Sequence, residues 1–567
     1  MAEVDRRTFL KVAGSGAVTA AVAGCTSQQP ADGGDETTQE DGGTTTDDTT
    51  SSGGGDENEM VYMAVDALSS IDPAKPGGAT DYSIILNLYD TFLYIGGGED
   101  FKTVGNLATD WTTENDSQTW VFTLREDVTF HDGTPLTAED VVYSMKRALR
   151  LKAGPTFLWL DVIEPENISA RGEYEVVFDL NYPFGPFFAS LAQFFVANSS
   201  VAKENEEDGS YGEHGDYAQD YLGNTPAGSG PYTLESWEQS SQLVMDAYPD
   251  YWGGWEENQF DTARVKIVGE DSTAKILMKQ GDADLSSKFL ATEIYEEMST
   301  YDNVEILKSP QLFTWMFHMF TQKPPLDDVN VRKAITYAFD YEPVVTEIFA
   351  GGDVAQGPVP IKMPGHNDDI PAYSQDLDTA KAALDDAEYS LAEINDIEIE
   401  VMYTSVLAWE RPISLLLQSA LKKIGIENVT LADTEWATML DRVTSKESTP
   451  HFTQVGNTAK MLSPDSYTFG MYHSSSWGKI NASSWWTTDE LEGTLEDARR
   501  TASQAERFAK YKEAQQLIVD GYPSLYLANP PYRAARNTNL GGWSYKGLLS
   551  YDHRFYDMHR IGDGRAK

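Results

Sequence analysis

The most reactive side chain in the sequence is its single thiol. Cys25 is the only cysteine among 567 residues, and it ends the small-residue run Val22-Ala23-Gly24-Cys25. Small residues directly before a cysteine are typical of a lipoprotein cleavage site, where the thiol receives lipid and becomes the first residue of the mature chain. Upstream, Arg6-Arg7 followed by Thr-Phe-Leu-Lys has the order of a twin-arginine export signal. We therefore predict a signal peptide over 1–24, with Arg6 and Arg7 read for export and Cys25 lipidated.

The residues around the thiol favour anchoring by lipid. The stretch 12–24 is too short and too rich in small residues to span a bilayer, which needs about 20 apolar residues. Residues 25–58 are mostly Thr, Ser, Gly, Gln, Asp and Glu, a composition that buries too little surface to fold, so we predict a disordered tether with a span of roughly 30 Å. A buried cysteine on an amphipathic N-terminus is the alternative interpretation.

No residue pattern predicts catalysis. The eight histidines are scattered and no two have the His-x-x-x-His spacing of a metal site. A Gly-x-Ser-x-Gly nucleophile motif, a phosphate-binding loop and a cysteine nucleophile downstream of the tether are all absent from the sequence. We expect no enzyme, no catalytic residue, no cofactor and no metal site.

The charge excludes another class of function. Asp and Glu number 90 against 42 Lys and Arg, which gives a formal charge of −48 and a pI near 4.3. Such a surface repels phosphates, so we expect no nucleic-acid partner. Above about 1 M salt the screening length falls to roughly 3 Å and the self-repulsion nearly vanishes, so the charge favours a hypersaline, halophilic setting. An acidic protein of dilute medium is the alternative.

Behind the tether, the sequence predicts an α/β protein large enough for two or three domains. Apolar or alternating segments predict strands, and 3.6-residue apolar periodicity with capping residues predicts helices. A helix begins after Thr137, with Asp140 in a capping box; another is capped by Asp327 or Asp328; a third starts at Pro412. The remaining segments are a helix over 503–519 and strands over 60–65, 120–125, 173–180, 397–403, 427–431 and 524–527.

Three blocks resemble the family 5 solute-binding proteins of ABC importers, which include dipeptide, oligopeptide, nickel and some oligosaccharide receptors. They stand in the family's order and the resemblance extends from about residue 58 to the C-terminus. The blocks are Leu107-Ala108-Thr109-Asp110-Trp111 continuing through 120–144, Gly228-Ser229-Gly230-Pro231-Tyr232 with 248–254, and Val331-Arg332-Lys333-Ala334-Ile335 continuing to Asp340.

The resemblance implies a two-lobe, class II periplasmic-binding-protein-like α/β fold that closes over a ligand by a hinge. Lobe I would cover 59–309, with a subdomain inserted at about 86–200. Lobe II would cover 310–528, and 529–567 would return to lobe I. The crossings would lie near 311–314 and 527–530.

The resemblance also implies where a ligand binds. Family peptide receptors have Gly-Trp, two residues, an Asp that captures the peptide amino group, and a Pro four residues later. In this sequence Asn457 replaces the Trp, Lys460 stands at the Asp position and Pro464 matches. A lysine would repel a peptide N-terminus, so the usual amine anchor is expected to be absent, unless Asp465 replaces it.

Three further residues are candidate ligand contacts. Trp436 matches a family position that lines the oligopeptide pocket, with ordinary core packing as the alternative. Trp409 and Arg411 precede the helix predicted from Pro412, whose N-terminus favours anions, so Arg411 could pair with a ligand carboxylate or remain a solvated surface residue. If Arg411 and Lys460 both face the cleft, the ligand is anionic.

The sequence as a whole predicts a monomeric, lipid-anchored receptor at the extracellular face of the membrane. Its partners would be a small solute, most simply a peptide, and the permease subunits of an ABC importer. An oligosaccharide or other anionic solute is the alternative within this fold. A stalked surface structural protein and a secreted hydrolase are the alternatives from other classes.

The charge generates a first prediction. The unfolding temperature should rise strongly between about 0.1 M and multimolar KCl, because screening removes the repulsion among carboxylates. Thermal unfolding followed by circular dichroism checks this, with NaCl as a parallel series. A flat curve in both salts would contradict the hypersaline interpretation.

Overall fold

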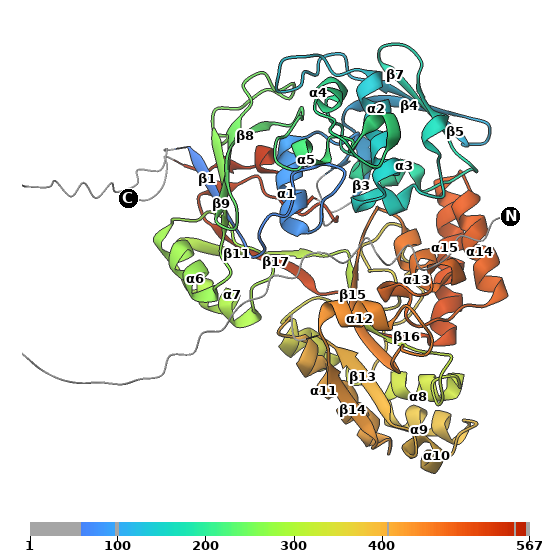
Figure 1. The fold of residues 1–567 in the computed structure, drawn as a ribbon. Helices are drawn as coiled ribbons and strands as arrows, with labels where there is room; N and C mark the ends of the chain where they lie inside the picture. The colour runs from blue at the N-terminus through green and yellow to red at the C-terminus, as the bar shows by residue number, and fades with distance from the viewer. Residues whose placement is uncertain (1–57, 97–100, 405–406, 549–550, 563–567) are drawn as a thin grey trace, which may run out of the picture. The chain divides into compact units, whose positions relative to one another are not determined.

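A computed structural model describes residues 58–96, 101–404, 407–548 and 551–562. Contacts divide the chain into two units, 1–54 and 55–567, and all of the described residues belong to the second unit. Arg6, Arg7 and Cys25 lie outside the described residues. The second unit forms two α/β lobes, each with its own sheet, joined by strands that run from one lobe into the other (Figure 1).

The first lobe is built on a four-stranded sheet of order β1-β10-β9-β8. Its strands are β1 (Glu59–Ala64), β8 (Tyr232–Glu238), β9 (Gln242–Ala247) and β10 (Thr262–Ile267). Successive residues of β1 point to opposite faces. Met60 and Tyr62 therefore join a core with α1 (Ala79–Leu88), and Val61 and Met63 join one with α6 (Asp271–Gln280) and α7 (Thr292–Met298). The predicted strand at 60–65 is confirmed.

A second sheet of the first lobe has the order β4-β5-β7-β6. Helix α2 (Ala138–Leu151) packs beside it and begins with the predicted capping box, in which the Thr137 N–H donates to Asp140 at 2.9 Å. Phe92, Phe122 and Phe178 meet edge to face in its core. The elements are β2 (Leu93–Gly96), β3 (Lys102–Gly105), β4 (Ala108–Glu114), β5 (Thr119–Leu124), β6 (Ile168–Ala170), β7 (Glu175–Asp179), α3 (Phe187–Ser190), α4 (Ser199–Glu204) and α5 (Gln219–Leu222).

Two pairs of strands carry the chain between the lobes. In the first lobe, β11 (Val304–Pro310) pairs antiparallel with β17 (Pro531–Asn537). In the second, β12 (Phe313–Met319) pairs antiparallel with β16 (Ser524–Ala528). Residues 311–312 and 529–530 are thus the only links between these pairs in the described chain, and the Asn529 amide ties them by donating to the Phe313 carbonyl at 2.9 Å.

The second lobe has a five-stranded sheet of order β14-β13-β15-β12-β16, with β13 and β14 parallel. Helices α8 and α11 contribute Val331, Ile335, Ile413 and Leu417 to its core. The elements are β13 (Ile399–Tyr403), β14 (Val429–Asp433), β15 (Phe452–Thr458), α8 (Val329–Ala338), α9 (Leu377–Asp385), α10 (Leu391–Asn395), α11 (Glu410–Lys423), α12 (Trp436–Arg442), α13 (Phe469–Tyr472), α14 (Asp489–Arg500) and α15 (Gln504–Gly521).

One predicted helix start is wrong by two residues. Asp328 caps α8 as expected, accepting from the Asn330 N–H at 2.7 Å. Helix α11, however, begins at Glu410, so Pro412 is its third residue. A proline is tolerated throughout the first helical turn because the N–H groups there have no intrahelical acceptor. Arg411 therefore lies within the helix instead of preceding it.

The C-terminal segment returns to the first lobe. Strands β18 (Leu540–Gly541) and β19 (His559–Arg560) pair with each other. The buried Arg560 guanidinium donates to Asp284 and to the Glu59 carbonyl, both at 2.7 Å. These bonds join the end of the chain to β1.

The two lobes touch at a glycine. The Gly185 N–H, from the first lobe, donates to the Arg499 carbonyl on α14 at 2.7 Å. A Cβ at Gly185 would lie 2.4 Å from the Thr501 carbonyl oxygen and 2.5 Å from the Arg507 guanidinium. Only a residue without a side chain permits this approach.

Gly185→Ala should therefore hold the lobes apart. Overpacking costs about 1–3 kcal/mol, and this cost falls on the closed arrangement alone. We expect a larger radius of gyration by small-angle X-ray scattering. Gly493→Ala is the matched control, since nothing lies within 4 Å of a Cβ at that position of α14. Equal radii for the wild type and both variants would contradict the importance of this contact.

Candidate functional site

A cavity of about 790 Å³ lies between the lobes. The first lobe contributes residues 101–120 and 185–189 to its walls, and the second lobe contributes residues 361–364, 462–463 and 502–508. Its size is that of a small-molecule site, and such sites commonly have apolar walls with few polar groups. Its aromatic lining residues are Phe101, Trp111, Trp120, Phe188 and Phe508.

The end of β15 and the loop after it carry three predicted site residues, and Leu462 and Ser463 of this loop line the cavity. Near the end of β15 lies Gly456, whose backbone fits between two aromatic rings. A Cβ there would lie 2.4 Å from the Phe313 ring and 2.5 Å from the Trp315 ring. The glycine therefore sets the path of the segment that carries Asn457, Lys460 and Asp465.

Asn457 does not fit the predicted role of a ligand contact. Its side chain is buried; its amide N–H donates to the Ser466 carbonyl at 3.2 Å, and its oxygen accepts from Asn481 at 3.2 Å. Both ends of the amide are used within lobe II. We therefore assign Asn457 to holding the loop in place.

Asp465 does not fit the predicted role of a substitute amine anchor. Its carboxylate accepts two hydrogen bonds of 2.8 Å from Arg499 and one of 2.8 Å from the Tyr511 hydroxyl. Burial acts to lower the pKa of Arg499, but the Asp465 charge outweighs it and raises that pKa. Since both carboxylate oxygens are occupied, we exclude Asp465 as a ligand residue.

Lys460 is half-buried near the junction of the lobes. Its ammonium donates to the Thr458 hydroxyl at 3.1 Å, and no carboxylate of the described residues lies within ion-pair distance of it. Burial lowers the pKa of Lys460, and the charge of Lys288 lowers it further. Of the predicted site residues that are buried or half-buried, Lys460 is the one whose charge has no ion-pair partner in the described part of the chain.

The other predicted contacts are separated. Trp409 packs edge to face on Trp315 and Phe349, at 5.9 and 5.7 Å between ring centroids, so it belongs to the lobe II core near Gly456. Arg411 is exposed. Trp436 has 49% of its surface exposed at the start of α12. Within the described part of the chain, no hydrogen bond, ion pair or ring contact brings Arg411 or Trp436 to Lys460.

Glu410 bonds Thr404, the residue that follows β13. Its buried carboxylate accepts from the Thr404 N–H at 2.7 Å and from the Thr404 hydroxyl at 2.8 Å. Burial raises its pKa to about 7, against the lowering effect of these two bonds.

Sequence reasoning missed Lys288, whose charge bears on Lys460, and the two residues in contact with Lys288, which are Asp552 and Tyr532. Lys288 and Asp552 form an ion pair whose side chains are 8% and 2% exposed. Both come from irregular segments with no periodicity or motif, so no sequence signal could have found them. Tyr532 lies on β17, where an aromatic residue is ordinary.

Comparison with known proteins decides the family. Residues 102–479 match the bacterial extracellular solute-binding proteins, family 5 Middle. The chain belongs to family 5. It is 30% identical over 489 residues to the probable D,D-dipeptide-binding periplasmic protein of Escherichia coli, covering 85% of this chain and 90% of that protein. It is 26% identical over 445 residues to the dipeptide-binding protein of the same organism, covering 76% and 81%.

Solved structures share the fold. An ABC transporter substrate-binding protein of Listeria monocytogenes superposes with a TM-score of 0.77 at 19% identity, covering 88% of this chain and 99% of that one. The oligopeptide-binding protein AppA of Bacillus subtilis, solved with a nonapeptide, gives 0.69 at 21% identity, covering 89% and 99%. The predicted two-lobe periplasmic-binding-protein fold is confirmed. Family membership also confirms the prediction of a non-enzymatic solute receptor of an ABC importer that acts outside the cytoplasm.

Three histidines of this family 5 protein are held by a hydrogen bond or by burial. His131 bonds the Gly230 carbonyl at 2.9 Å, and burial lowers the pKa of His318 and of His553 to about 3. The described residues contain no cluster of three or more potential metal ligands. Within the same residues, no helix is long and apolar enough to cross a membrane.

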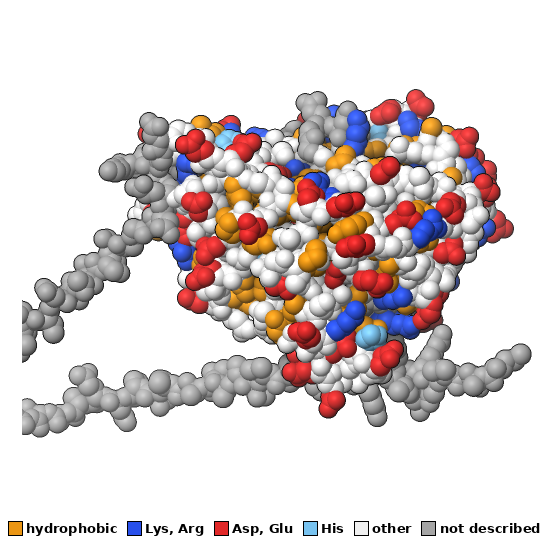
Figure 2. Space-filling view, turned by 90° about the horizontal axis from the view of Figure 1, so that it is seen from above, with side chains coloured by type: hydrophobic (Ala, Val, Ile, Leu, Met, Phe, Trp, Pro, Cys, Tyr) orange, Lys and Arg blue, Asp and Glu red, His pale blue; other side chains and the backbone are white. Residues whose placement is uncertain are grey.

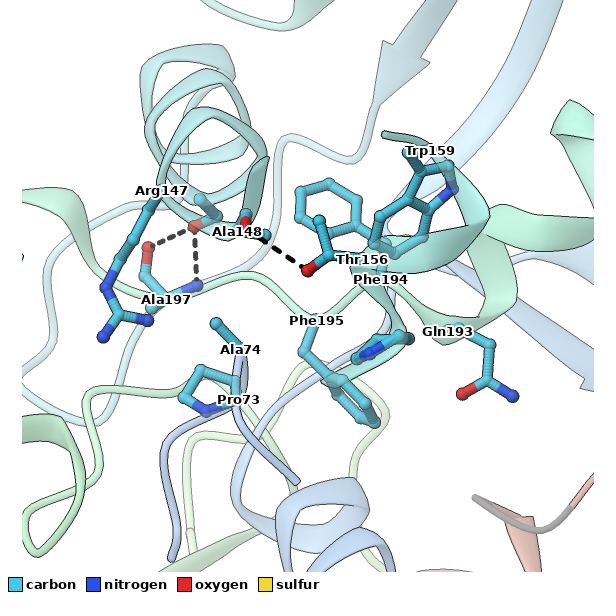
Figure 3. A pocket seen from close by; sticks show the side chains of 12 residues that line it. Pro73, Ala74, Arg147, Ala148, Thr156, Trp159, Gln193, Phe194, Phe195 and Ala197 are labelled. Carbon is cyan, nitrogen blue, oxygen red and sulfur yellow. Dashed lines mark hydrogen bonds between the residues drawn. The ribbon is translucent and has the colours of Figure 1, made fainter. Parts of the chain in front are cut away.

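A second, enclosed cavity lies inside the first lobe beside α2 (Figure 3). Its volume of about 10 Å³ is close to the minimum for one water molecule. Figure 3 shows the Thr156 hydroxyl beside it, bonded to the Ala148 carbonyl at 3.2 Å. This cavity is too small for any transported solute.

Asp465→Asn separates the two roles considered for this carboxylate. Breaking its ion pair with Arg499 should lower the free energy of unfolding by about 2–4 kcal/mol, because a mostly buried guanidinium loses its counter-charge. Urea unfolding measures this. Glu400→Gln is the control: its pair with Arg442 is about a quarter exposed on each side, so we expect a loss of at most about 1 kcal/mol. Unchanged stability in Asp465→Asn, together with lost solute binding, would restore Asp465 as a ligand residue.

Proposed function

We propose that this family 5 receptor captures a peptide or peptide-like solute between its lobes and delivers it to a membrane permease as a monomer. The observation that carries the proposal is the cavity between two lobes in contact, of a size suited to a short peptide. Peptide-binding relatives at up to 30% identity support it. We assign lobe I to 59–309, with an insertion at about 86–200, lobe II to 310–528, and the return to lobe I to 529–567. The links between strands at 311–312 and 529–530 support these bounds.

The solute is proposed to carry an anionic group. Lys460 replaces the carboxylate that family peptide receptors use to hold a free amino group, and no counter-charge reaches it from the described residues. Trp436, exposed on α12, is retained as a candidate stacking surface. Arg411 is retained only as an exposed cation on lobe II, the lobe that also carries Lys460 and Trp436.

The receptor is proposed to be exported through the twin-arginine route and anchored by lipid on Cys25. The order of Arg6-Arg7, the short apolar stretch and Val22-Ala23-Gly24-Cys25 supports this. The tether at 25–58 would let the receptor move beside its permease.

A hypersaline habitat is proposed from the charge of −48. Acidic side chains are spread across the face seen in Figure 2, with only small groups of basic ones between them. Such a distribution favours solubility in concentrated salt.

The solute itself can be identified directly. Mass spectrometry of whatever co-purifies with the protein, released by mild denaturation, should find peptides or peptide-like compounds. A sugar in their place would favour the oligosaccharide alternative.

Cys25→Ser tests the anchor. Without the thiol no acyl chain can be attached, so the protein should be released into the medium. Immunoblots of medium and membrane fractions measure this. A second variant with Arg6→Lys and Arg7→Lys should remain in the cytoplasm, since the twin-arginine route reads the guanidinium pair. Membrane retention of Cys25→Ser would contradict lipidation, and normal export of the double variant would point to the general secretory route.

A further inference from the structure

A further cavity, of about 560 Å³, lies beside the links that join the lobes. Its walls come from α7, from the neighbouring strands β11 and β17 and from the loop at Ala350 (Figure 1). None of its lining residues lines the cavity between the lobes. Two of them are cations, Lys308 on β11 and Arg533 on β17, and each stands three residues from a link.

The two cations face each other across the strand pair. Strands β11 and β17 are antiparallel, and Lys308 is directly opposite Arg533 in their register. Directly opposite side chains lie on one face with Cβ atoms about 4.5–5.5 Å apart, and like charges in such a pair are destabilising. Glu305 and Arg536, also directly opposite each other on these strands, show the favourable arrangement, with an ion pair of 2.6 Å. The sequence places a lysine where a carboxylate would have completed a second such pair.

The carboxylates around this cavity do not balance the two cations. In the described part of the chain neither Lys308 nor Arg533 forms an ion pair, and Glu305 is paired with Arg536. Glu296, exposed on α7, is the one other carboxylate that lines the cavity. Two cations therefore face one unpaired carboxylate, in a protein whose acidic side chains outnumber its basic ones by 90 to 42.

Arg533 is the more deeply buried of the two cations, with 8% of its surface exposed. Its guanidinium donates to the Phe349 carbonyl, to the Ala350 carbonyl at 2.6 Å and to the Thr292 hydroxyl at 3.3 Å. Its Nε is buried and has no hydrogen-bond partner among the described residues. Burial lowers the pKa of Arg533. A cation in such surroundings is costly to desolvate unless an anion accompanies it.

The bonds of Arg533 also join the two lobes. Arg533 and Thr292 belong to the first lobe, whereas Phe349 packs in the core of the second. The next residue, Ala350, has a φ of +44°, in the left-handed region that a non-glycine residue rarely adopts. Such a conformation persists only where the surroundings fix it. Whatever stabilises the Arg533 charge therefore also stabilises this joint between the lobes.

We propose that Lys308 and Arg533 bind a small inorganic anion, such as chloride, at the joint between the lobes. The anion lies between the two opposed side chains, in the place of the missing carboxylate, and removes their repulsion. Because Arg533 also holds the loop of the second lobe, the bound anion stabilises the joint. The site goes beyond the proposed function, since it is separate from the solute cavity and does not depend on the nature of the solute.

NMR of the chloride ion tests binding directly. In about 0.1 M KCl with about 2 M potassium gluconate, where long-range attraction is screened, the wild type should broaden the chloride line. Lys308→Met should lose most of this broadening; Lys308 is exposed, so the variant should still fold. Lys266→Met is the matched control, because Lys266 lies on β10 opposite Gln242 and not opposite a cation, and it should broaden the line as the wild type does. Equal line widths for the wild type and Lys308→Met would overturn the proposal.

Thermal unfolding at a fixed potassium concentration measures the effect on stability. Lys308→Glu supplies the missing carboxylate opposite Arg533, so this variant should not respond to a bound anion. Replacing gluconate by chloride should raise the unfolding temperature of the wild type by about 1–3 °C relative to that of Lys308→Glu, and the rise should saturate, as for a ligand that binds the folded state alone. Screening and non-specific effects of the two anions act on both proteins and cancel in this difference. An equal response of both proteins would overturn the proposal.

Discussion

The chain passes between the lobes twice in adjacent places, and the rest of the structure depends on this. Because β11 pairs with β17 and β12 with β16, the two crossing segments are hydrogen-bonded to each other on both sides of the links, and in the second lobe this pair belongs to the five-stranded sheet. Each pair is hydrogen-bonded along its length, so we expect rotation of one lobe against the other to occur in the two-residue links. The Asn529 side chain bonds across these links, to Phe313 and to Thr314 at 3.0 Å, which keeps them together as they bend.

Charged side chains are arranged differently in the interior of the protein and on its surface. The surface carries the acidic excess, which salt can screen. The interior of the first lobe holds carboxylates in close pairs that salt cannot reach. Arg147 with Asp72 and Arg560 with Asp284 are both 6% exposed or less. Such pairs contribute little net stability but make each partner costly to remove. Against this background of matched pairs, Lys460 and Arg533 stand out because their charges have no ion-pair partner among the described residues.

Much of the fold could be predicted because its signals are local. The capping box at Thr137, the cap at Asp328 and the alternation at 120–125 act within a few residues, and all three appear as expected. The start of α11 was misplaced because a first-turn proline is compatible with several helix registers. Asp465 could not be placed by sequence, since its partner Arg499 is 34 residues away on another element. For the same reason the association of Lys288, Tyr532 and Asp552 becomes visible only when distant segments of the first lobe have folded together.

An acidic surface should repel the anionic solute proposed above, and concentrated salt would remove this conflict. With a charge of −48, long-range repulsion would slow the approach of any anion in dilute medium. Above about 1 M salt this repulsion extends only roughly 3 Å, less than the distance from the surface to a buried site. A contact between the proposed anionic group and Lys460 would form within hydrogen-bonding distance and away from bulk ions, so it would be weakened far less. Concentrated salt thus removes the barrier to approach while leaving the binding contact largely intact.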